Sequence, residues 1–189
     1  MAKYFSFLII LIFLGMVLIV PAGLATGPVK IHDVRVLYNK TDLVVYAVLK
    51  NSFTEDMKSA ILAGVPTTFT FTLKTYEEVP GWFDKKISRI TVKHTIKYDN
   101  VKQTFSVFSV DNGPAAVFQD FESAQRVMSE LSGIAVAPIS ELTRGNVYYV
   151  RIKAKLEKYR PQSIMRYIFF FASLGDFKTD WSPKQRITY

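Results

Sequence analysis

Cysteine is absent from all 189 residues of this chain. The protein therefore has no disulfide framework, no thiol nucleophile, no iron–sulfur cluster and no zinc site built on thiolates. Because no cysteine follows the apolar segment at the N-terminus, a bacterial lipoprotein is excluded as well. Oxidising surroundings neither help nor harm such a chain, so cysteine content leaves its compartment open.

Histidine is scarce, and the familiar catalytic motifs are missing. His32 and His94 fall in different predicted strands, without a His, Asp or Glu at metal-ligand spacing. His94 belongs to the apolar row of its strand, which favours a hydrogen-bonded core or rim histidine over a metal ligand or general base. The chain has no Gly-x-Ser-x-Gly elbow, no P-loop and no Gly-x-Gly-x-x-Gly fingerprint. We predict no catalytic, cofactor-binding or metal-binding residues.

The carboxylates do not form an obvious acid/base couple. Two pairs are adjacent in sequence, which points their side chains apart in a helix or strand: Glu55/Asp56 and Glu77/Glu78. Asp176 and Asp180 flank a short segment that contains Lys178, a pattern more typical of a local salt-bridge cluster than of a metal site. The two adjacent pairs are predicted to lie on the solvated surface.

Positive charge exceeds negative charge, but it is not concentrated. The formal net charge is +8, with no run of five Lys or Arg. This spread argues against nucleic-acid binding. It suits contact with anionic lipid headgroups or an acidic partner, and it is also compatible with a role in solubility alone.

The first 26 residues predict membrane targeting. Lys3 precedes 17 uncharged residues, Tyr4–Val20, and Gly23 and Ala25 then supply small residues at the two positions that signal peptidase inspects. A charged start, an apolar run and a small-residue exit are typical of a secretory signal peptide cleaved after Ala25. As a helix the run would rise about 25 Å, at the lower limit for a membrane span, so an uncleaved anchor stays open. Residues 27–189 would then form a single β-rich domain in the periplasm, exported or anchored to the inner membrane.

Period-two alternation and β-branched or aromatic residues predict about seven strands in that domain. The safest is the one in which Phe69, Phe71 and Leu73 alternate with threonines. The strand Leu43–Lys50 is apolar on both faces, so it is expected to be central in its sheet. The predicted strands are Ile31–Tyr38, Leu43–Lys50, Pro66–Tyr76, Ile87–Tyr98, Val101–Val110, Val147–Tyr159 and Ile164–Leu174.

Two short helices are predicted between the strands. Ser52-Phe-Thr-Glu55 reads as a capping box for a helix that Gly64 terminates. Asp120 is expected to cap a second helix, with its apolar stripe running from Phe121 to Leu131 before Gly133. The predicted fold class is α+β, mainly β: an antiparallel sheet or β-sandwich with two short helices, preceded by an N-terminal apolar helix.

One sheet face is predicted to be basic. Cationic residues occupy the outward row of two predicted strands, and they would form one docking face if those strands are neighbours. A merely solvated strand face is the alternative. The residues of this predicted basic face are Arg89, Lys93, Lys97, Arg151, Lys153 and Lys155.

Several features resemble a family of exported bacterial proteins, the domain of unknown function 4390. The resemblance covers roughly residues 30 to 182. Its marks are Ala60-Ile-Leu-Ala-Gly-Val-Pro66, the Thr/Phe strand, Trp82 and Asp84 before a long hairpin, Tyr98, the Phe121–Leu131 helix, the Tyr148–Leu156 strand and Asp176-Phe-Lys-Thr-Asp-Trp181. The resemblance implies an export signal and one β-rich domain, and it brings no catalytic residues.

Without catalytic motifs, the leading hypothesis is a non-catalytic extracytoplasmic binding or scaffold domain of the bacterial envelope. It needs no cofactor, its expected partner is another envelope protein, and it would meet the membrane through the N-terminal segment. The alternative is a lipid or hydrophobic-ligand carrier, because 15 Phe and 10 Tyr supply more aromatic surface than a small core strictly needs.

Overall fold

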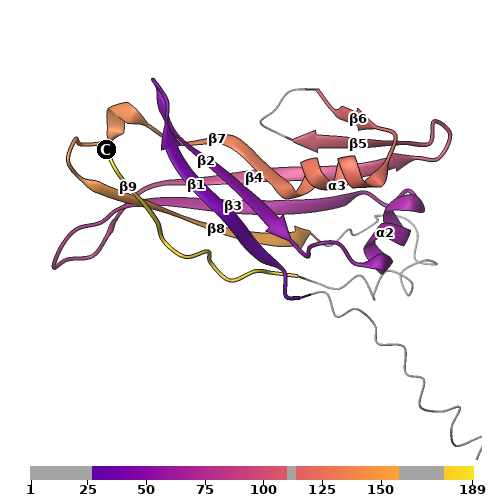
Figure 1. Ribbon diagram of the computed structural model, residues 1–189, viewed down its shortest axis with the longest axis horizontal. Coiled ribbons are helices and arrows are strands. Elements are labelled where there is room, and N and C mark those ends of the chain that lie inside the picture. Colours follow the sequence, from indigo (N-terminus) through magenta and orange to yellow (C-terminus); the bar gives the residue numbers. More distant parts are fainter. Residues whose placement is uncertain (1–26, 110–113, 158–176) are drawn as a thin grey trace, which may run out of the picture.

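The computed structural model describes residues 27–109, 114–157 and 177–189. The predicted targeting segment, the predicted strand Ile164–Leu174 and Asp176 lie outside these ranges. Within them, every helix is too short or too polar to cross a membrane. The described chain forms two antiparallel sheets and two short α-helices, which confirms the predicted mainly-β fold (Figure 1).

The larger sheet has six strands in the order β6-β5-β4-β3-β8-β9. Its middle is built by β3 (Thr67–Glu77), which pairs antiparallel with β4 (Lys85–Asp99) and with β8 (Val147–Glu157). The alternation of Phe and Thr along β3 sends the phenylalanines into the core and the threonines toward the outer face. The remaining strands are β5 (Thr104–Ser109), β6 (Ala116–Phe118) and β9 (Gln185–Thr188).

The smaller sheet contains β1 (Lys30–Tyr38), β2 (Asp42–Lys50) and β7 (Glu130–Pro138) in the order β1-β2-β7. The strand predicted to be central, β2, is central in this sheet. The turn between β1 and β2 is held by Asn39, whose Oδ1 atom accepts hydrogen bonds from the amides of Thr41 and Asp42 at 2.8 and 2.7 Å. A polar side chain that satisfies the backbone in this way is what the Asn39–Asp42 sequence predicts.

Both predicted helices form, but the N-cap of the first lies two residues later than predicted. Helix α2 spans Glu55–Leu62, and its N-cap is Thr54, whose Oγ1 atom accepts a hydrogen bond from the Met57 amide at 3.2 Å. The Ser52 capping box is therefore wrong; the Ser52 hydroxyl is buried, 3.4 Å from the hydroxyl of Ser129. Helix α3 spans Phe121–Ser129 and is capped by Asp120, as predicted.

Strand β7 is the main departure from the sequence prediction. The stripe expected to continue helical to Leu131 turns into a strand at Glu130, without an intervening loop. Gly133 has a φ of +67° and lies where the β2–β7 register slips between Val45 and Ala47. It therefore serves a β-bulge and does not end a helix; both roles require a positive φ that glycine adopts without strain.

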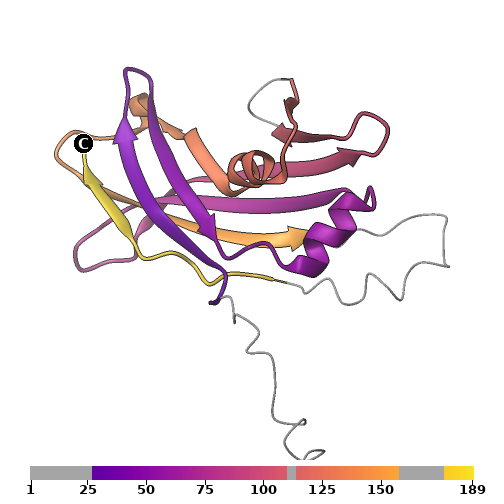
Figure 2. The same cartoon turned by 45° about the vertical axis from the view of Figure 1, so that its right-hand side comes forward.

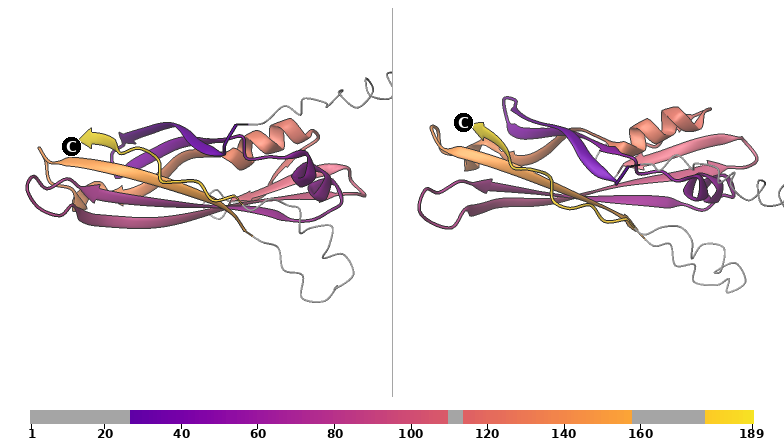
Figure 3. Two further views of the ribbon diagram at one scale, coloured as in Figure 1. Left: turned by 90° about the horizontal axis from the view of Figure 1, so that it is seen from below. Right: turned by 60° about the horizontal axis from the view of Figure 1, so that its bottom comes forward.

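The two sheets pack face to face as a sandwich, with the short 3₁₀ turn Ile139–Glu141 leading from β7 toward β8 (Figures 2 and 3). Helix α3 lies on the same side of the large sheet as β7, and α2 lies at one end of the sandwich (Figure 1). One continuous core joins the inner faces; its centre includes Leu43, Phe69, Phe71, Ile96 and Ile152, each fully buried.

The edge of the large sheet beside β8 is completed by residues 177–189. Where this segment is irregular, side chains replace backbone acceptors: Thr179 Oγ1 accepts from the Ala154 amide, and Ser182 Oγ accepts from the Ile152 amide, both at 3.0 Å. Beyond β9, the ring of Tyr189 packs edge-on against Tyr38 of β1, with 5.8 Å between centroids. This contact links the edge of the large sheet to the edge of the small one.

Candidate functional site

The outer face of the large sheet carries rows of cationic side chains that the strand register brings together. Lys74 of β3 lies opposite Arg89 of β4 on one side and Arg151 of β8 on the other. Paired residues point to the same side of a sheet and neighbouring strands are about 5 Å apart, so three cations share one row. Further along β3, Thr72 lies between Thr91 and Lys153, and Thr70 lies between Lys93 and Lys155.

An aromatic side chain lies over this face. The ring of Trp181 has the Lys74 ammonium 4.7 Å from its centroid, the Lys153 ammonium at 5.8 Å and the Arg151 guanidinium at 5.9 Å. Cations at these distances are attracted by the negative face of an indole ring. Trp181 is only partly buried, so this aromatic surface borders the cations and is open to a partner.

One acidic side chain lies in the next row along β3, where Glu157 at the end of β8 is paired with Thr68. Glu157 accepts a hydrogen bond from the Thr70 hydroxyl at 2.6 Å and forms an ion pair with Lys93 at 2.9 Å. The Thr70 hydrogen bond, followed by Lys93, holds the pKa of Glu157 below its usual value. The charge of Lys93 is thus locally neutralised by Glu157. Lys155, on the other side of Thr70 in the same row, is exposed.

The six predicted residues share one face of the large sheet, although their two strands are not adjacent as the prediction required. Strands β4 and β8 are not neighbours, because β3 lies between them. Their cations nevertheless share one face, and β3 contributes Lys74 to it. Lys97 lies toward the β5 side of the same face, opposite Ser106. Lys74 and Trp181 were missed by sequence reasoning; Lys74 continues the outward threonine row of β3, which was the available signal. This basic face is defined here as Lys74, Arg89, Lys93, Lys97, Arg151, Lys153, Lys155 and Trp181.

The two histidines lie in different sheets and differ in burial. His32 is exposed on β1, whereas His94 is 2% exposed on the inner face of β4. The Nδ1 atom of His94 lies 3.1 Å from the Met128 carbonyl oxygen, to which it donates, and its ring packs edge-on against Phe71. Among the residues that the structure describes, no three His, Asp or Glu side chains gather closely enough to hold a metal ion.

The predicted surface carboxylates take up different surroundings. Glu55 and Asp56 are exposed in the first turn of α2, where negative charge suits the helix N-terminus, and Asp180 is exposed beside Trp181. Glu77 accepts from Asn146 Nδ2 at 2.5 Å and lies 3.7 Å from the Lys85 ammonium. Glu78 receives both a 2.8 and a 2.9 Å hydrogen bond from the Arg186 guanidinium, which lowers its pKa.

A polar cluster holds the base of the β3–β4 hairpin against the C-terminal segment. The Tyr149 hydroxyl donates to Asp84 at 2.7 Å, and the Lys184 ammonium lies 3.0 Å from the same carboxylate oxygen and 4.1 Å from the Tyr149 ring centroid. The hydrogen bond from Tyr149, and then that from Lys184, lower the pKa of Asp84. Burial and the nearby carboxylate raise the pKa of Tyr149 well above its ordinary value.

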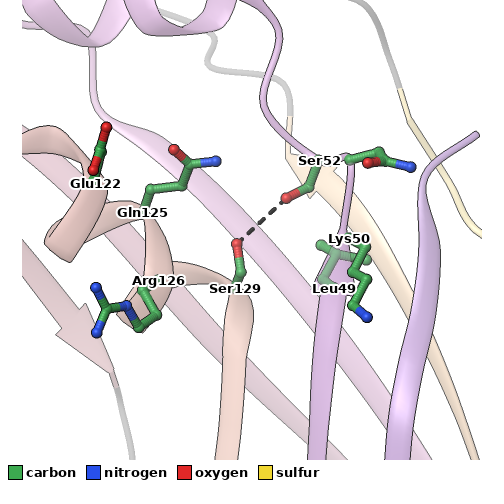
Figure 4. Close-up of a pocket in the computed structure, with 8 residues that line it drawn as sticks. Leu49, Lys50, Ser52, Glu122, Gln125, Arg126 and Ser129 are labelled. Atoms are coloured by element: carbon green, nitrogen blue, oxygen red, sulfur yellow. Dashed lines mark hydrogen bonds between the residues drawn. The ribbon is translucent and has the colours of Figure 1, made fainter. Parts of the chain in front are cut away.

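Two hollows open on the surface of the described chain. The first, about 390 Å³, lies between the end of β2 and α3; Figure 4 shows Ser52 and Ser129 pointing toward each other at its floor, with Glu122, Gln125 and Arg126 on the helix. Its walls mix Lys50 and Arg126 with Glu122, and it is open to solvent. The second, about 490 Å³, lies between residues 28–31 and 177–183. Neither has the enclosed apolar character of a small-molecule site.

Comparisons with known proteins place the chain in a family. The searches of curated proteins and of solved structures gave no match. A family model described as "Domain of unknown function (DUF4390)" matches residues 27–184, which is most of the chain and includes both α-helices and the strands β1 to β8. The match agrees with the resemblance seen in the sequence. The chain therefore belongs to the domain of unknown function 4390 family.

Proposed function

We propose that this protein is a non-catalytic binding domain of the bacterial envelope, held on the periplasmic side of the inner membrane, and that its basic face docks an acidic surface of another envelope protein. The observation that carries the proposal is the row Lys74, Arg89 and Arg151, with Trp181 lying over Lys74. Like charges placed side by side repel one another, so such a row costs stability unless an anionic partner offsets it.

The shape of the face favours a macromolecular partner. It extends over three adjacent strands, β4, β3 and β8, whereas small-molecule ligands are normally held in concave pockets. Arginine and tryptophan are also the residues that most often anchor protein interfaces. Complementary charge would speed association and orient the partner, and salt would weaken it.

The carrier alternative finds less support in the core. The aromatic residues that suggested it pack against one another: Phe69 contacts both Phe53 and Phe177 with 5.1 Å between centroids, and Phe121 contacts both Phe53 and Phe105 at 5.6 Å. They fill the sandwich and do not line either of the two hollows described above, apart from Phe177. Co-purified lipid detected by native mass spectrometry would nevertheless reinstate the carrier.

The test places a photo-crosslinking amino acid at Thr72, in the middle of the basic face, in cells of the native host. We expect a discrete crosslinked protein that is lost when Arg89, Lys153 and Lys155 are all changed to Glu. The matched control changes to Glu three exposed cations that lie in connections between strands, and it should leave the crosslink intact. These residues are Lys40, Lys102 and Arg144. With a purified partner, the face variant should bind about tenfold to 100-fold more weakly.

Two results would contradict the proposal. A crosslinked protein that survives reversal of the basic face would show that charge does not recruit it. Adducts with phospholipid alone would assign the basic face to anionic lipid and remove the protein partner.

A further inference from the structure

The tip of the β3–β4 hairpin exposes two adjacent aromatic side chains. Trp82 is 78% exposed and Phe83 is 86% exposed, and their rings meet edge-on with 6.2 Å between centroids. An exposed Leu or Val needs no explanation, but two large aromatic rings side by side at the tip of a hairpin form an apolar patch that water hydrates poorly. Nothing in the proposed function uses this tip.

The conformation of the tip is fixed by a defined turn. Its turn has Pro80 followed by Gly81 with a φ of +73°, and the Trp82 amide donates to the Val79 carbonyl at 3.2 Å. Proline and then a glycine of positive φ are the residues that a type II turn requires. The base of the hairpin is fixed by the Asp84 hydrogen bonds to Tyr149 and Lys184 and by the bidentate pair of Glu78 with Arg186.

The position of the tip lets it reach a surface beyond the domain. The β3–β4 and β4–β5 connections lie at opposite ends of the long axis, and the aromatic tip forms one of those extremes (Figures 1 and 3). Lys85 and Lys86 follow the tip directly and are exposed. The three carboxylates at the base, Glu77, Glu78 and Asp84, each have a cationic partner in Lys85, Arg186 or Lys184. Lys86 therefore gives this end of the hairpin a net positive charge.

We propose that the β3–β4 tip inserts Trp82 and Phe83 into the interfacial layer of a phospholipid bilayer, with Lys85 and Lys86 at the level of anionic headgroups. Tryptophan is enriched at this depth because its ring is apolar and its N–H is polar. Lysines next to the inserted rings are attracted by anionic lipids. The site is separate from the basic face, so the proposal stands or falls independently of the docking function.

Because the chain has no cysteine, a single Phe83→Cys variant gives a unique position for an environment-sensitive NBD label. The full chain is reconstituted into phosphatidylcholine vesicles that contain phosphatidylglycerol and spin-labelled lipid in both leaflets, so either orientation of the protein can report contact. We expect the label at position 83 to be quenched and blue-shifted. The matched control is Val101→Cys at the opposite hairpin end, where the wild-type side chain is 94% exposed and the label should stay unquenched.

Two further variants separate the roles of the rings and the lysines. In the Phe83→Cys background, Trp82→Ser should reduce quenching several-fold in vesicles of either composition. Lys85→Gln with Lys86→Gln should reduce it in vesicles with phosphatidylglycerol and leave it unchanged in phosphatidylcholine alone. Equal quenching at positions 83 and 101 overturns the proposal. So does an unquenched label at 83 combined with a protein crosslink from that position in cells, which would make the tip a protein anchor.

Discussion

The hydroxyl of Tyr149 on β8 donates a 2.7 Å hydrogen bond to Asp84, which directly precedes β4. Strand β8 and strand β4, which begins after Asp84, are not neighbours, since β3 lies between them. The bond therefore ties the hairpin loop back over the sheet, and the stacked ring of Tyr76, 5.2 Å from that of Tyr149, packs beneath it. The aromatic tip is held in place by this connection.

We expect Tyr149→Phe to lower the free energy of unfolding by about 1.5 kcal/mol, because it removes one hydrogen bond to a charged acceptor and keeps the buried ring. Equilibrium urea unfolding measures the change. Tyr38→Phe is the control, since Tyr38 is exposed, and it should change stability by less than about 0.5 kcal/mol. An unaltered unfolding curve for Tyr149→Phe would mean that the bond to Asp84 does not stabilise the hairpin.

Stability should fall in acid partly through Glu78 and Asp84. Both pKa values are lowered in the folded protein, Glu78 mainly by Arg186 and Asp84 mainly by Tyr149. The unfolded chain then binds protons at a higher pH than the folded one. Their contribution is complete above the ordinary values of 4.5 and 3.8, and it is lost as the pH falls through and below them.

Urea unfolding as a function of pH tests this. The wild-type protein should lose stability below those values, and a Glu78→Gln/Asp84→Asn double variant should lose less over the same interval. Other carboxylates with lowered pKa values, such as Asp120, continue to contribute in both proteins. Parallel curves for the two proteins would show that the hairpin cluster plays no part.

Gly133→Ala should destabilise the protein by about 1–3 kcal/mol, because alanine pays for the left-handed backbone that the β7 bulge requires. A Cβ atom there would also lie 3.4 Å from the Tyr46 hydroxyl oxygen. Gly145→Ala is the matched comparison: its φ is +84°, but nothing lies within 4 Å of the added carbon. The end of the partly exposed Tyr46 side chain can move aside, so the positive φ dominates and thermal unfolding should show losses of similar size in the two variants. A much larger loss in Gly133→Ala would show that the contact with Tyr46 also matters.

The Thr179 hydroxyl is expected to stabilise the edge of the large sheet where residues 177–184 run irregularly beside β8. Thr179→Val leaves the buried Ala154 amide without its acceptor, which should cost about 1–3 kcal/mol. Thr179→Ser keeps the hydroxyl and should retain most of the stability. Hydrogen exchange at the Ala154 amide gives a local readout, and it should accelerate in the valine variant alone.

Local patterns in the sequence predicted much of the fold. The Phe/Thr alternation of β3, the polar turn at Asn39 and the Asp120 cap all depend on neighbouring residues, and each is confirmed. Strand β7 was missed because Gly133 is equally suited to a helix end and to a bulge, and only pairing with β2 decides between them. Strands β6 and β9 are three and four residues long, too short for periodicity to reveal.

The sequence predicted which side chains of each strand point outward, but not how the strands place them next to one another on the basic face. Period two placed Arg89 and Arg151 outward on their strands, and that much follows from spacing alone. Which strand lies between them depends on long-range pairing, so Lys74 could not be added from sequence. Trp181 reaches the face from a segment beyond β8, and only the folded edge brings its ring 4.7 Å from the Lys74 ammonium.

The contact of Tyr38 with Tyr189 has a consequence for the order in which the domain assembles. Tyr189 packs against Tyr38 of β1, and the residues just before it, Gln185–Thr188, pair with Val147–Val150 of β8. Contacts between such distant positions form slowly, since a long loop must close before they can stabilise anything. Until residues 185–188 have been synthesised, the large sheet lacks its edge strand β9, so this part of the sandwich can form only late in translation.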